Sequence, residues 1–332
     1  VKVVIWAFFD VKRNGNANSI VGASADDTND DTQQQATLEG SLDLECIQQL
    51  IADLDAEGYD DTLHLTAFGG WNGAHLDPSF QSAEDWYQSW KDVAGHIFHG
   101  IDWDLEGNDD LQSPYNYFSM RTLHMMGGIS RLAKRDGYVV TMAPAQSYLD
   151  IQSSRFSRYV NLTDPLRTWH ADFHYFGANV YAYLLAQYGD AIDLVSVQFY
   201  ESYSRAALEV FHHGLIPEAY LKFYVRDHAD RDERFFVEFD DDDDCDVPSQ
   251  EVQLPLSKLV LGFTNVRLEG HKMIYFPIEC VQAAYQDLVD QEITPRGFMY
   301  WCIEEEDVDG MDYAKDLNSV LHVRGSGVAE ES

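Results

Sequence analysis

The sequence predicts an α/β protein that folds as a single (β/α)8 barrel. Short runs of β-branched and aromatic residues recur along the chain, and longer amphipathic stretches with helical spacing lie between them. Strands that alternate with helices in this way are typical of βαβ units and a parallel sheet. The chain has 332 residues, and at this length a closed eight-stranded barrel is the simplest such architecture.

The predicted strands are short and mostly apolar. Seven runs meet this description, at positions 1–10, 62–71, 100–106, 138–144, 193–200, 258–264 and 297–303. An eighth strand is either the segment 18–24 or a strand upstream of Val1. The first choice leaves almost no room for an intervening helix, so the barrel's first strand is expected to be missing or irregular.

The predicted helices lie between these strands. The stretch "DLECIQQLIADLDAEG" over 43–58 has helical spacing and ends on Gly58, a residue favoured just after a helix. The other clear helices cover 83–98, 114–135 and 277–291.

Two segments look irregular. Residues 11–41 contain "SADDTNDDTQQQ" and are predicted to form a polar surface loop. Residues 226–252 carry the dense acidic run "EFDDDDDCDVP", whose spacing does not match an EF-hand calcium loop, so we predict a solvated loop. We assign residues 1–325 to one barrel domain and 326–332 to a flexible tail.

The composition excludes some classes of partner. The chain has 57 acidic and 22 basic residues and a formal net charge of −35. Nucleic acid and anionic membrane surfaces bind basic patches, so neither is an expected partner. The charge fits solubility in high salt, or a solvated acidic surface without special meaning.

Neither cysteine spacing nor hydropathy indicates a zinc site or a membrane anchor. The four cysteines are scattered and include no C-x-x-C pair, which argues against zinc and leaves disulfide pairing undecided. No apolar run approaches the ~18 residues of a membrane span. A sequon begins at Asn161, and glycosylation there requires secretion.

The stretch "FHGIDWDLEG" places three acids at two-residue spacing in an apolar run. Residues at this spacing share one face of a strand, so Asp102, Asp104 and Glu106 should point into the barrel together. Glu106 should then lie nearest the C-terminal mouth, where barrel active sites occur. A magnesium or calcium site is an alternative, but no nearby His or Asn completes a ligand set.

Crowding three acids has a chemical consequence. They cannot all ionise, so at least one should hold a proton near neutral pH. A proton shared by Asp102 and Asp104, with a raised pKa at Glu106, would supply a general acid. A solvated edge strand is the alternative, but the large apolar residues between the acids favour an interior strand.

This stretch resembles a known signature. "HGIDWDLEG" is similar to the D-G-x-D-x-D-x-E motif of the family 18 glycoside hydrolases, the chitinases and their relatives, with His99 in place of the outermost acid. Further similarities follow in the family's order. "LTAFGGW" resembles the S-x-G-G segment of the third strand with Ala67 in place of Ser, "TMAP" the fifth strand, "VSVQFYE" the V-Q-F-Y of plant class III and fungal chitinases, and "GFMYWCIEEEDVDG" the eighth strand.

The resemblance also bears on the barrel itself. "VVIWAFFD" looks most like the family's second strand, which favours a first strand upstream of Val1. The family's inserted α+β domain normally lies between the seventh and eighth strands. Only 32 residues separate Thr264 from Gly297, so this insert is expected to be absent and the cleft shallower, which favours endo action.

The resemblance implies catalytic roles. Glu106 would protonate the glycosidic oxygen, and the substrate's own N-acetyl carbonyl would attack C1 in place of an enzyme nucleophile. Asp104 would orient the acetamido N–H and Asp102 would share its proton. Tyr200 would hydrogen-bond the acetamido group. Glu106 would then act as the base toward water, and no metal or organic cofactor is required.

It also implies substrate-binding residues. Trp301 would form the apolar floor of the −1 sugar site. The other residues expected to contact substrate are Gln198, Met142, Gly70 and Trp71.

The leading functional hypothesis is retaining hydrolysis of β-1,4-linked N-acetylglucosamine polymers by a monomeric, secreted enzyme. One alternative is an endo-β-N-acetylglucosaminidase that cuts the chitobiose core of N-glycans. The other is a chitin-binding lectin on the same barrel, although such relatives usually lack the terminal acid that is present here as Glu106.

Overall fold

The computed structural model describes residues 2–13, 36–40, 42–71, 73, 75–109, 116–160, 178–242, 244–265, 273–303 and 312–322. Its strands are β1 Lys2–Arg13, β2 Ala36–Gly40, β3 Thr62–Gly70, β4 Gly100–Leu105, β5 Asn116–Tyr117, β6 Val139–Met142, β7 Tyr159–Val160, β8 Leu194–Gln198, β9 Arg234–Val237, β10 Gln250–Gln253, β11 Leu259–Thr264 and β12 Gly297–Trp301. Its α-helices are α1 Leu44–Ala56, α2 Ala83–Ala94, α3 Met120–Arg135, α4 Ala182–Tyr188, α5 Arg205–Ala207, α6 Pro217–Asp230, α7 Ile278–Asp290 and α8 Tyr313–Leu321.

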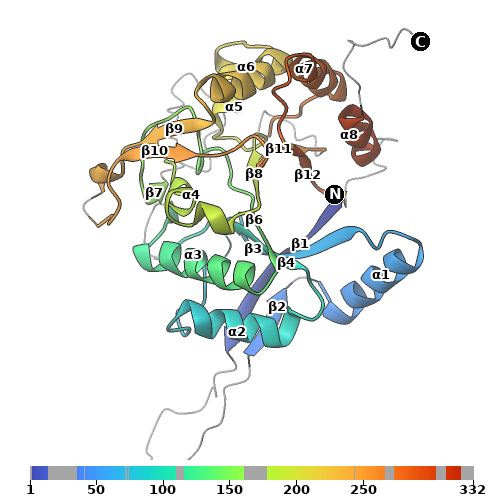
Figure 1. Cartoon of the computed structure of the whole chain (residues 1–332), viewed down its shortest axis with the longest axis vertical. Coiled ribbons are helices and arrows are strands. Elements are labelled where there is room, and N and C mark those ends of the chain that lie inside the picture. The colour runs from blue at the N-terminus through green and yellow to red at the C-terminus, as the bar shows by residue number, and fades with distance from the viewer. Residues whose placement is uncertain are drawn as a thin grey trace, which may run out of the picture.

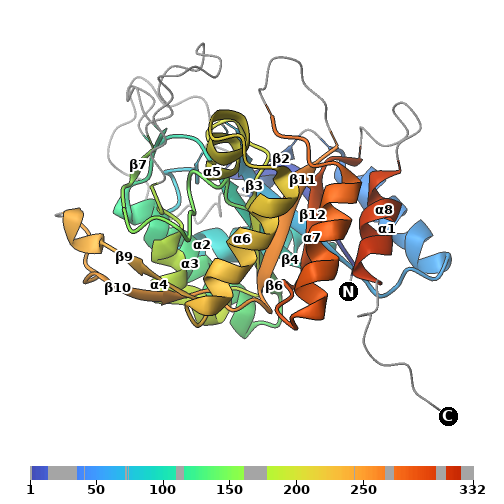
Figure 2. The ribbon, with the colours of Figure 1, turned by 90° about the horizontal axis from the view of Figure 1, so that it is seen from above.

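One mostly parallel sheet organises the fold. Its 8 strands run in the order β12-β11-β8-β6-β4-β3-β1-β2, and only the pair β1 and β2 is antiparallel. The helices lie around the outside of this curved sheet (Figure 1). On one side, α6, α7 and α8 cover the part of the sheet that holds β11 and β12 (Figure 2). This is the α/β barrel architecture that the sequence predicts.

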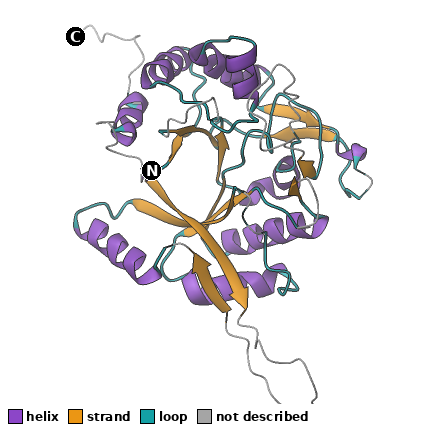
Figure 3. Ribbon diagram, turned by 180° about the vertical axis from the view of Figure 1, so that it is seen from behind, coloured by secondary structure: helices purple, strands orange, loops and turns teal. Residues whose placement is uncertain are grey.

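The two ends of the parallel run approach each other at the barrel mouth. Among the described residues no ladder of hydrogen bonds joins β1 to β12, so the barrel is open along this seam. The rings of Phe8 in β1 and Trp301 in β12 nevertheless stack, with centroids 5.7 Å apart and planes 22° apart. Figure 3 shows the strands curling around one interior with the helices outside them. Side-chain stacking therefore joins the two edges where the ladder does not.

The seven strands predicted from the sequence are confirmed, and two irregular segments need correction. The loop expected over 11–41 is shorter, because β1 continues to Arg13 and β2 occupies Ala36–Gly40. The candidate strand 18–24, the sequon at Asn161 and the tail 326–332 lie outside the described residues.

The segment 226–252 is also more regular than predicted. It contains the end of α6 and the antiparallel pair β9 and β10, and the acidic run occupies the turn between these two strands. The helix predicted over 114–135 begins later, at Met120, because the side chain of Ser119 caps it by accepting a hydrogen bond from Thr122 N.

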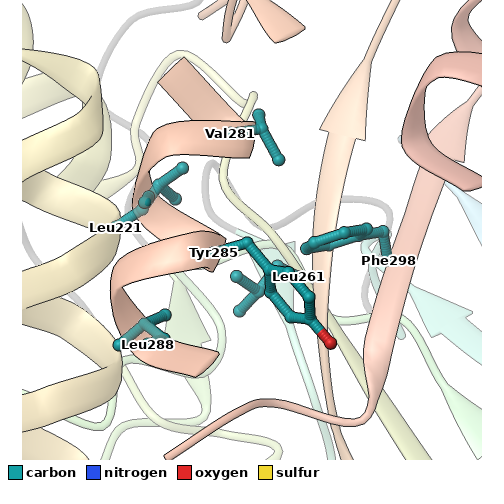
Figure 4. Close-up of a pocket in the computed structure, with 7 residues that line it drawn as sticks. Leu221, Leu261, Val281, Tyr285, Leu288 and Phe298 are labelled. Carbon is teal, nitrogen blue, oxygen red and sulfur yellow. The ribbon is translucent and has the colours of Figure 1, made fainter. Parts of the chain in front are cut away.

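The layer between sheet and helices is apolar. Trp103 of β4 is fully buried against the helix layer, and its Nε1 donates to Ser130 Oγ of α3 at 2.9 Å. On the opposite side, side chains of α6 and α7 meet those of β11 and β12 (Figure 4), namely Leu221, Val281, Tyr285, Leu288, Leu261 and Phe298. These residues fill the space behind the barrel wall, so that region is core.

Close approach of β4 to β6 depends on one glycine. A Cβ at Gly100 would lie 1.9 Å from the carbonyl oxygen of Val139. Any other residue there would push the two strands apart, so the glycine in "HGIDWDLEG" sets the start of the acidic strand.

Two further features concern the class of protein. No helix in the described part of the chain is long and apolar enough to cross a membrane. Each of the four cysteines is free, so no disulfide stabilises the fold.

The formal net charge of −35 makes the stability of the fold sensitive to salt. Raising NaCl from about 0.1 M to about 1 M shortens the screening length from about 10 Å to about 3 Å. We expect the unfolding temperature to rise by several degrees, as measured by calorimetry near neutral pH. The same series near pH 4.4, the isoelectric point, should show a much smaller rise, and an equal rise there would contradict charge repulsion as the cause.

Candidate active site

The two acids of β4 and the acid directly after it lie together inside the barrel. Asp102, Asp104 and Glu106 are only 1%, 7% and 6% exposed. The alternate residues face the helix layer, as Trp103 does. Burial to this extent disfavours the ionised form of a carboxyl group, so the chemistry of the site depends on which of these acids is protonated.

Asp102 is the deepest of the three acids. It accepts a hydrogen bond from Thr141 Oγ1 on the neighbouring strand β6, with which it is in register. Burial raises the pKa of Asp102 to about 6, and the Thr141 hydrogen bond opposes this rise.

Asp104 lies between Asp102 and Glu106, and the charges of both affect its pKa. Its Oδ1 accepts a hydrogen bond from Gln198 Nε2 at 2.8 Å, and Gln198 comes from the end of β8. The pKa of Asp104 is raised well above its usual value. Burial is the largest cause, and the charges of Glu106 and Asp102 are the next largest. A side-chain hydrogen bond between Asp104 and Glu106 raises the pKa of Asp104 and lowers that of Glu106.

Glu106 comes directly after β4 and is the outermost acid. Burial, and after it the charge of Glu201, raise the pKa of Glu106 to about 8, while hydrogen bonds with Asp104 and Gln198 oppose this rise. Near neutral pH Glu106 therefore carries a proton, which is the state that a general acid needs.

Glu201 is a fourth buried carboxylate that the sequence analysis did not select. It follows Tyr200 just after β8 and is 8% exposed. Its two oxygens accept backbone hydrogen bonds from Ser147 N at 2.8 Å and Tyr203 N at 3.1 Å. Burial raises its pKa to about 7. An acid directly after the tyrosine of "VQFYE" is the sequence signal that could have identified it.

Tyr200 also faces this cluster. Its ring is buried, and the pKa of its hydroxyl is raised by burial and then by the charges of Asp104 and Glu106. The structure thus brings together five of the predicted residues, namely Asp102, Asp104, Glu106, Gln198 and Tyr200.

Aromatic residues surround the mouth. Trp301, at the end of β12, is 36% exposed and stacks on Phe8, a residue absent from the predicted set. Gly70 has a φ of +83°, and a Cβ there would lie 2.6 Å from the Phe8 ring, so this glycine makes room for the ring. Trp71, directly after β3, is 52% exposed.

The described residues contain no group of three or more His, Cys, Asp or Glu placed to hold a metal ion. The buried acids are instead hydrogen-bonded to Thr141, Gln198 and backbone N–H groups. Hydrogen bonding of this kind suits carboxyl groups that exchange protons.

Comparison with solved structures identifies the fold. No protein-family model and no curated protein matches the sequence. A family 18 chitinase from Crocus vernus is 12% identical, with 96% of this chain and 89% of that chain covered and a TM-score of 0.55. A GH18 chitinase from Pseudoalteromonas aurantia is 15% identical, with 96% and 92% covered and a TM-score of 0.56.

The chain has the fold of the family 18 chitinases. The similarity extends over nearly the whole length of both chains, so the barrel is compared as a whole. Only 32 residues separate Thr264 of β11 from Gly297 of β12, and the described ones contain α7, so the segment is too short for the large α+β insert.

Met142, which the sequence predicts to contact substrate, faces away from the acids. Met142 is fully buried and in register with Trp103 on one side and Val195 on the other. Paired residues of parallel strands face the same side, so Met142 points toward the helices of this chitinase fold. The backbone of the adjacent Ala143 contacts the site instead, because its carbonyl oxygen accepts from Gln198 Nε2 at 2.5 Å.

The raised pKa of Glu106 predicts how the Glu106→Gln variant should behave. The folded protein holds this proton up to about pH 8, whereas the unfolded chain releases it near 4.5. The acid therefore destabilises the fold increasingly as pH rises between these values, and a glutamine does not. At pH 7 to 8 we expect the variant to be more stable by roughly 1–3 kcal/mol in urea unfolding.

This stability difference should vanish near pH 4, where both states hold the proton. A Glu106→Gln variant that is less stable than wild type at every pH would contradict the proton-bearing buried acid.

Proposed function

We propose that the protein is a retaining glycoside hydrolase of the family 18 type that cleaves β-1,4 linkages between N-acetylglucosamine residues, as in chitin and chitooligosaccharides. The observation that carries this proposal is the buried Glu106, whose pKa burial raises to about 8 and which lies directly after β4 of a chitinase-type barrel, beside Asp104. Because chitin is an extracellular polymer, we propose that the enzyme acts outside the cell.

Bond cleavage begins with proton donation. Glu106 has a pKa of about 8 and is the outermost of the three acids, so in our proposal it is the acid that meets the glycosidic oxygen. Transfer of this proton to the leaving oxygen prevents negative charge from building up on that oxygen in the transition state. Glu106 is left as a carboxylate, which is the form needed when it later acts as the base toward water.

The substrate supplies the nucleophile. Attack by the acetamido carbonyl oxygen on C1 forms an oxazolinium ion, and its N–H needs an acceptor that carries negative charge. Asp104 is that acceptor in our proposal, oriented by Gln198, while Asp102 stores the displaced proton below it. Tyr200 then donates to the acetamido oxygen. Finally Glu106 takes a proton from water, and that water opens the oxazolinium ring.

Aromatic surface completes the sugar site. Trp301 presents a partly exposed ring whose back is supported by Phe8, so it offers a rigid apolar floor for a distorted sugar. Trp71 offers a second exposed ring at the neighbouring side of the mouth.

The first experiment is hydrolysis of a fluorogenic chitobiose or chitotriose substrate. Wild type should release the fluorophore, and Glu106→Gln should lower kcat by about 10²–10⁴-fold through loss of the general acid. The exposed Glu251→Gln is a matched control and should leave kcat unchanged. The first product seen by NMR should be the β-anomer, and an α-anomer would exclude retention.

Other outcomes point to the alternatives. Binding of chitooligosaccharide by wild type without cleavage would replace the hydrolase with a lectin. Release of oligosaccharide from an N-glycoprotein, with no action on chitooligosaccharides, would replace chitin with the chitobiose core.

Glu201 should set the upper pH limit of the reaction. After burial, its charge is the largest contribution to the raised pKa of Glu106. Removing it in Glu201→Gln should move the alkaline limb of the kcat/KM profile to lower pH, by up to about one unit. Glu201→Asp should restore part of the shift, and an alkaline limb that does not move would show that Glu201 does not act on Glu106.

A further inference from the structure

The acidic run at 240–246 has no role in the proposed chemistry. It nevertheless contacts Arg158, the most buried arginine among the described residues. Arg158 is 3% exposed, and its Nε and Nη2 donate to the two carboxylate oxygens of Asp242 at 2.7 and 2.9 Å. Nη2 also donates to Asp244 Oδ2 at 2.8 Å. This bidentate pairing lowers the pKa of Asp242, mainly through the Arg158 hydrogen bonds, so the pair stays ionised.

The ion pair connects two separate parts of the fold. Asp242 and Asp244 belong to the turn of the β9–β10 hairpin, which lies next to α4 on the side of the molecule that carries β7 (Figures 1 and 2). Arg158 directly precedes β7. An isolated parallel β-bridge between their backbones also joins Arg155 to Glu238 in the same region.

Arg158 in turn holds strand β5. Its Nη1 donates to Tyr117 Oη at 2.8 Å, and its carbonyl oxygen accepts from Phe118 N at 2.9 Å. Its guanidinium lies 5.4 Å from the centroid of the Tyr117 ring, which stacks on Tyr159 of β7 at 4.5 Å. Arg158 therefore fixes the Tyr117–Tyr159 end of the β5–β7 pair.

Strand β5 presents Asn116 to the proposed general acid. Asn116 Nδ2 donates to the backbone carbonyl oxygen of Glu106, and also to Tyr148 Oη at 2.7 Å. Tyr148 Oη donates to the same Glu106 carbonyl at 2.8 Å. The carbonyl of the catalytic residue is thus held by two side chains, one of them carried by the strand that Arg158 fixes.

These side chains lie beyond the point where β6 stops pairing with β4. The ladder with β6 ends when Ala143 N donates to Trp103 O at 2.8 Å, and the next residue, Pro144, has no N–H to donate. Two residues after Trp103, the carbonyl oxygen of Leu105 accepts a hydrogen bond from Tyr181 Oη at 3.1 Å. At Glu106 the backbone relies on Tyr148 and Asn116 in the same way.

We propose that the acidic turn is a positioning element for Glu106, in which Asp242 and Asp244 fix Arg158, Arg158 fixes β5, and Asn116 with Tyr148 fixes the Glu106 backbone. This inference rests on the proposed function, because Glu106 is the acid of that reaction. It gives the run "EFDDDDDCDVP" a role inside the molecule, where the sequence suggested only a solvated loop or a calcium loop.

A displacement of Glu106 would affect the rate more than substrate binding. Its carboxyl group must meet the glycosidic oxygen, and small errors in such a position lower kcat strongly. The rings that bind sugar, Trp301 and Trp71, belong to β12 and the end of β3, which Arg158 does not contact. The expected signature is therefore a lowered kcat with an unchanged KM.

The test compares Asp242→Asn with Asp240→Asn, a matched change in the same acidic run at an exposed position. Asp242→Asn should lower kcat on the chitotriose substrate by about tenfold, with KM within about twofold. Asp240→Asn should match wild type. Tyr148→Phe should lower kcat similarly, and the double variant Asp242→Asn/Tyr148→Phe should lose less than the product of the two single effects.

A second readout does not depend on hydrolysis. The pH titration of the Glu106 carboxyl can be followed by NMR in protein labelled with ¹³C at the glutamate carboxyls, with the resonance assigned through Glu106→Gln. Asp242→Asn should move this titration, because a shifted Glu106 changes its distance from Asp104 and Glu201, and Asp240→Asn should not. If wild type does not hydrolyse chitooligosaccharides, the proposed function fails while this titration still decides the positioning role.

Three results would overturn the proposal. Asp242→Asn could lower the unfolding temperature while kcat, KM and the Glu106 titration all match those of Asp240→Asn, which would make the ion pair merely structural. The effects of Asp242→Asn and Tyr148→Phe could multiply fully, which would make them independent. If Asp242→Asn does not fold, Asp244→Asn, at a side chain that is 77% exposed, replaces it, and a wild-type kcat and titration there would also count against the proposal.

Discussion

The burial of several carboxyl groups in one place is the constraint on which this structure depends. Four of them lie around the mouth of the barrel, each at most 8% exposed, namely Asp102, Asp104, Glu106 and Glu201. Water cannot stabilise their charges, so each must find a hydrogen-bond donor or keep its proton. Too few hydrogen-bond donors surround these carboxyl groups to stabilise all of them as anions. Some therefore keep a proton near neutral pH, and such a group can donate it.

The scaffold meets this constraint by bringing donors from several strands to one end of β4. Thr141 arrives on β6 and Gln198 on β8, because the parallel register sets their ends at the same level as the acids. Beyond the ladder, tyrosine and asparagine side chains take the place of strand N–H groups. The position of the acids is therefore set by strand register and then by side chains from distant segments.

Sequence periodicity predicts the first part of this arrangement but not the second. The two-residue spacing of the acids, with large apolar residues between them, is enough to predict an interior strand with one acidic face. The error at Met142 arose because the facing of a residue in "TMAP" depends on how β6 pairs with β4 and β8, and a single strand's sequence does not contain that register. Strand β2 was missed since five residues, "ATLEG", give too short a pattern within a polar segment.

Long-range pairs were also beyond the reach of the sequence. Arg158 and Asp242 are 84 positions apart, and nothing near either residue distinguishes this acid from its exposed neighbours. A run of aspartates predicts solvation on average, because most members of such runs are solvated. Only the fold selects the two that face a buried guanidinium, so the structural role of the run could not be separated from its surface role.

The crowding of acids also bears on whether the barrel catalyses or only binds. A carboxyl group whose pKa is raised by burial destabilises the folded state at neutral pH, and a glutamine in place of Glu106 would remove that penalty while keeping a polar group for sugar contacts. Glu201 adds a second such penalty beside the first. A sugar-binding protein has no need of a protonated acid, whereas a hydrolase requires one at the scissile bond. The presence of two such acids in one site is therefore the feature on which our proposal of hydrolysis, in place of binding alone, depends.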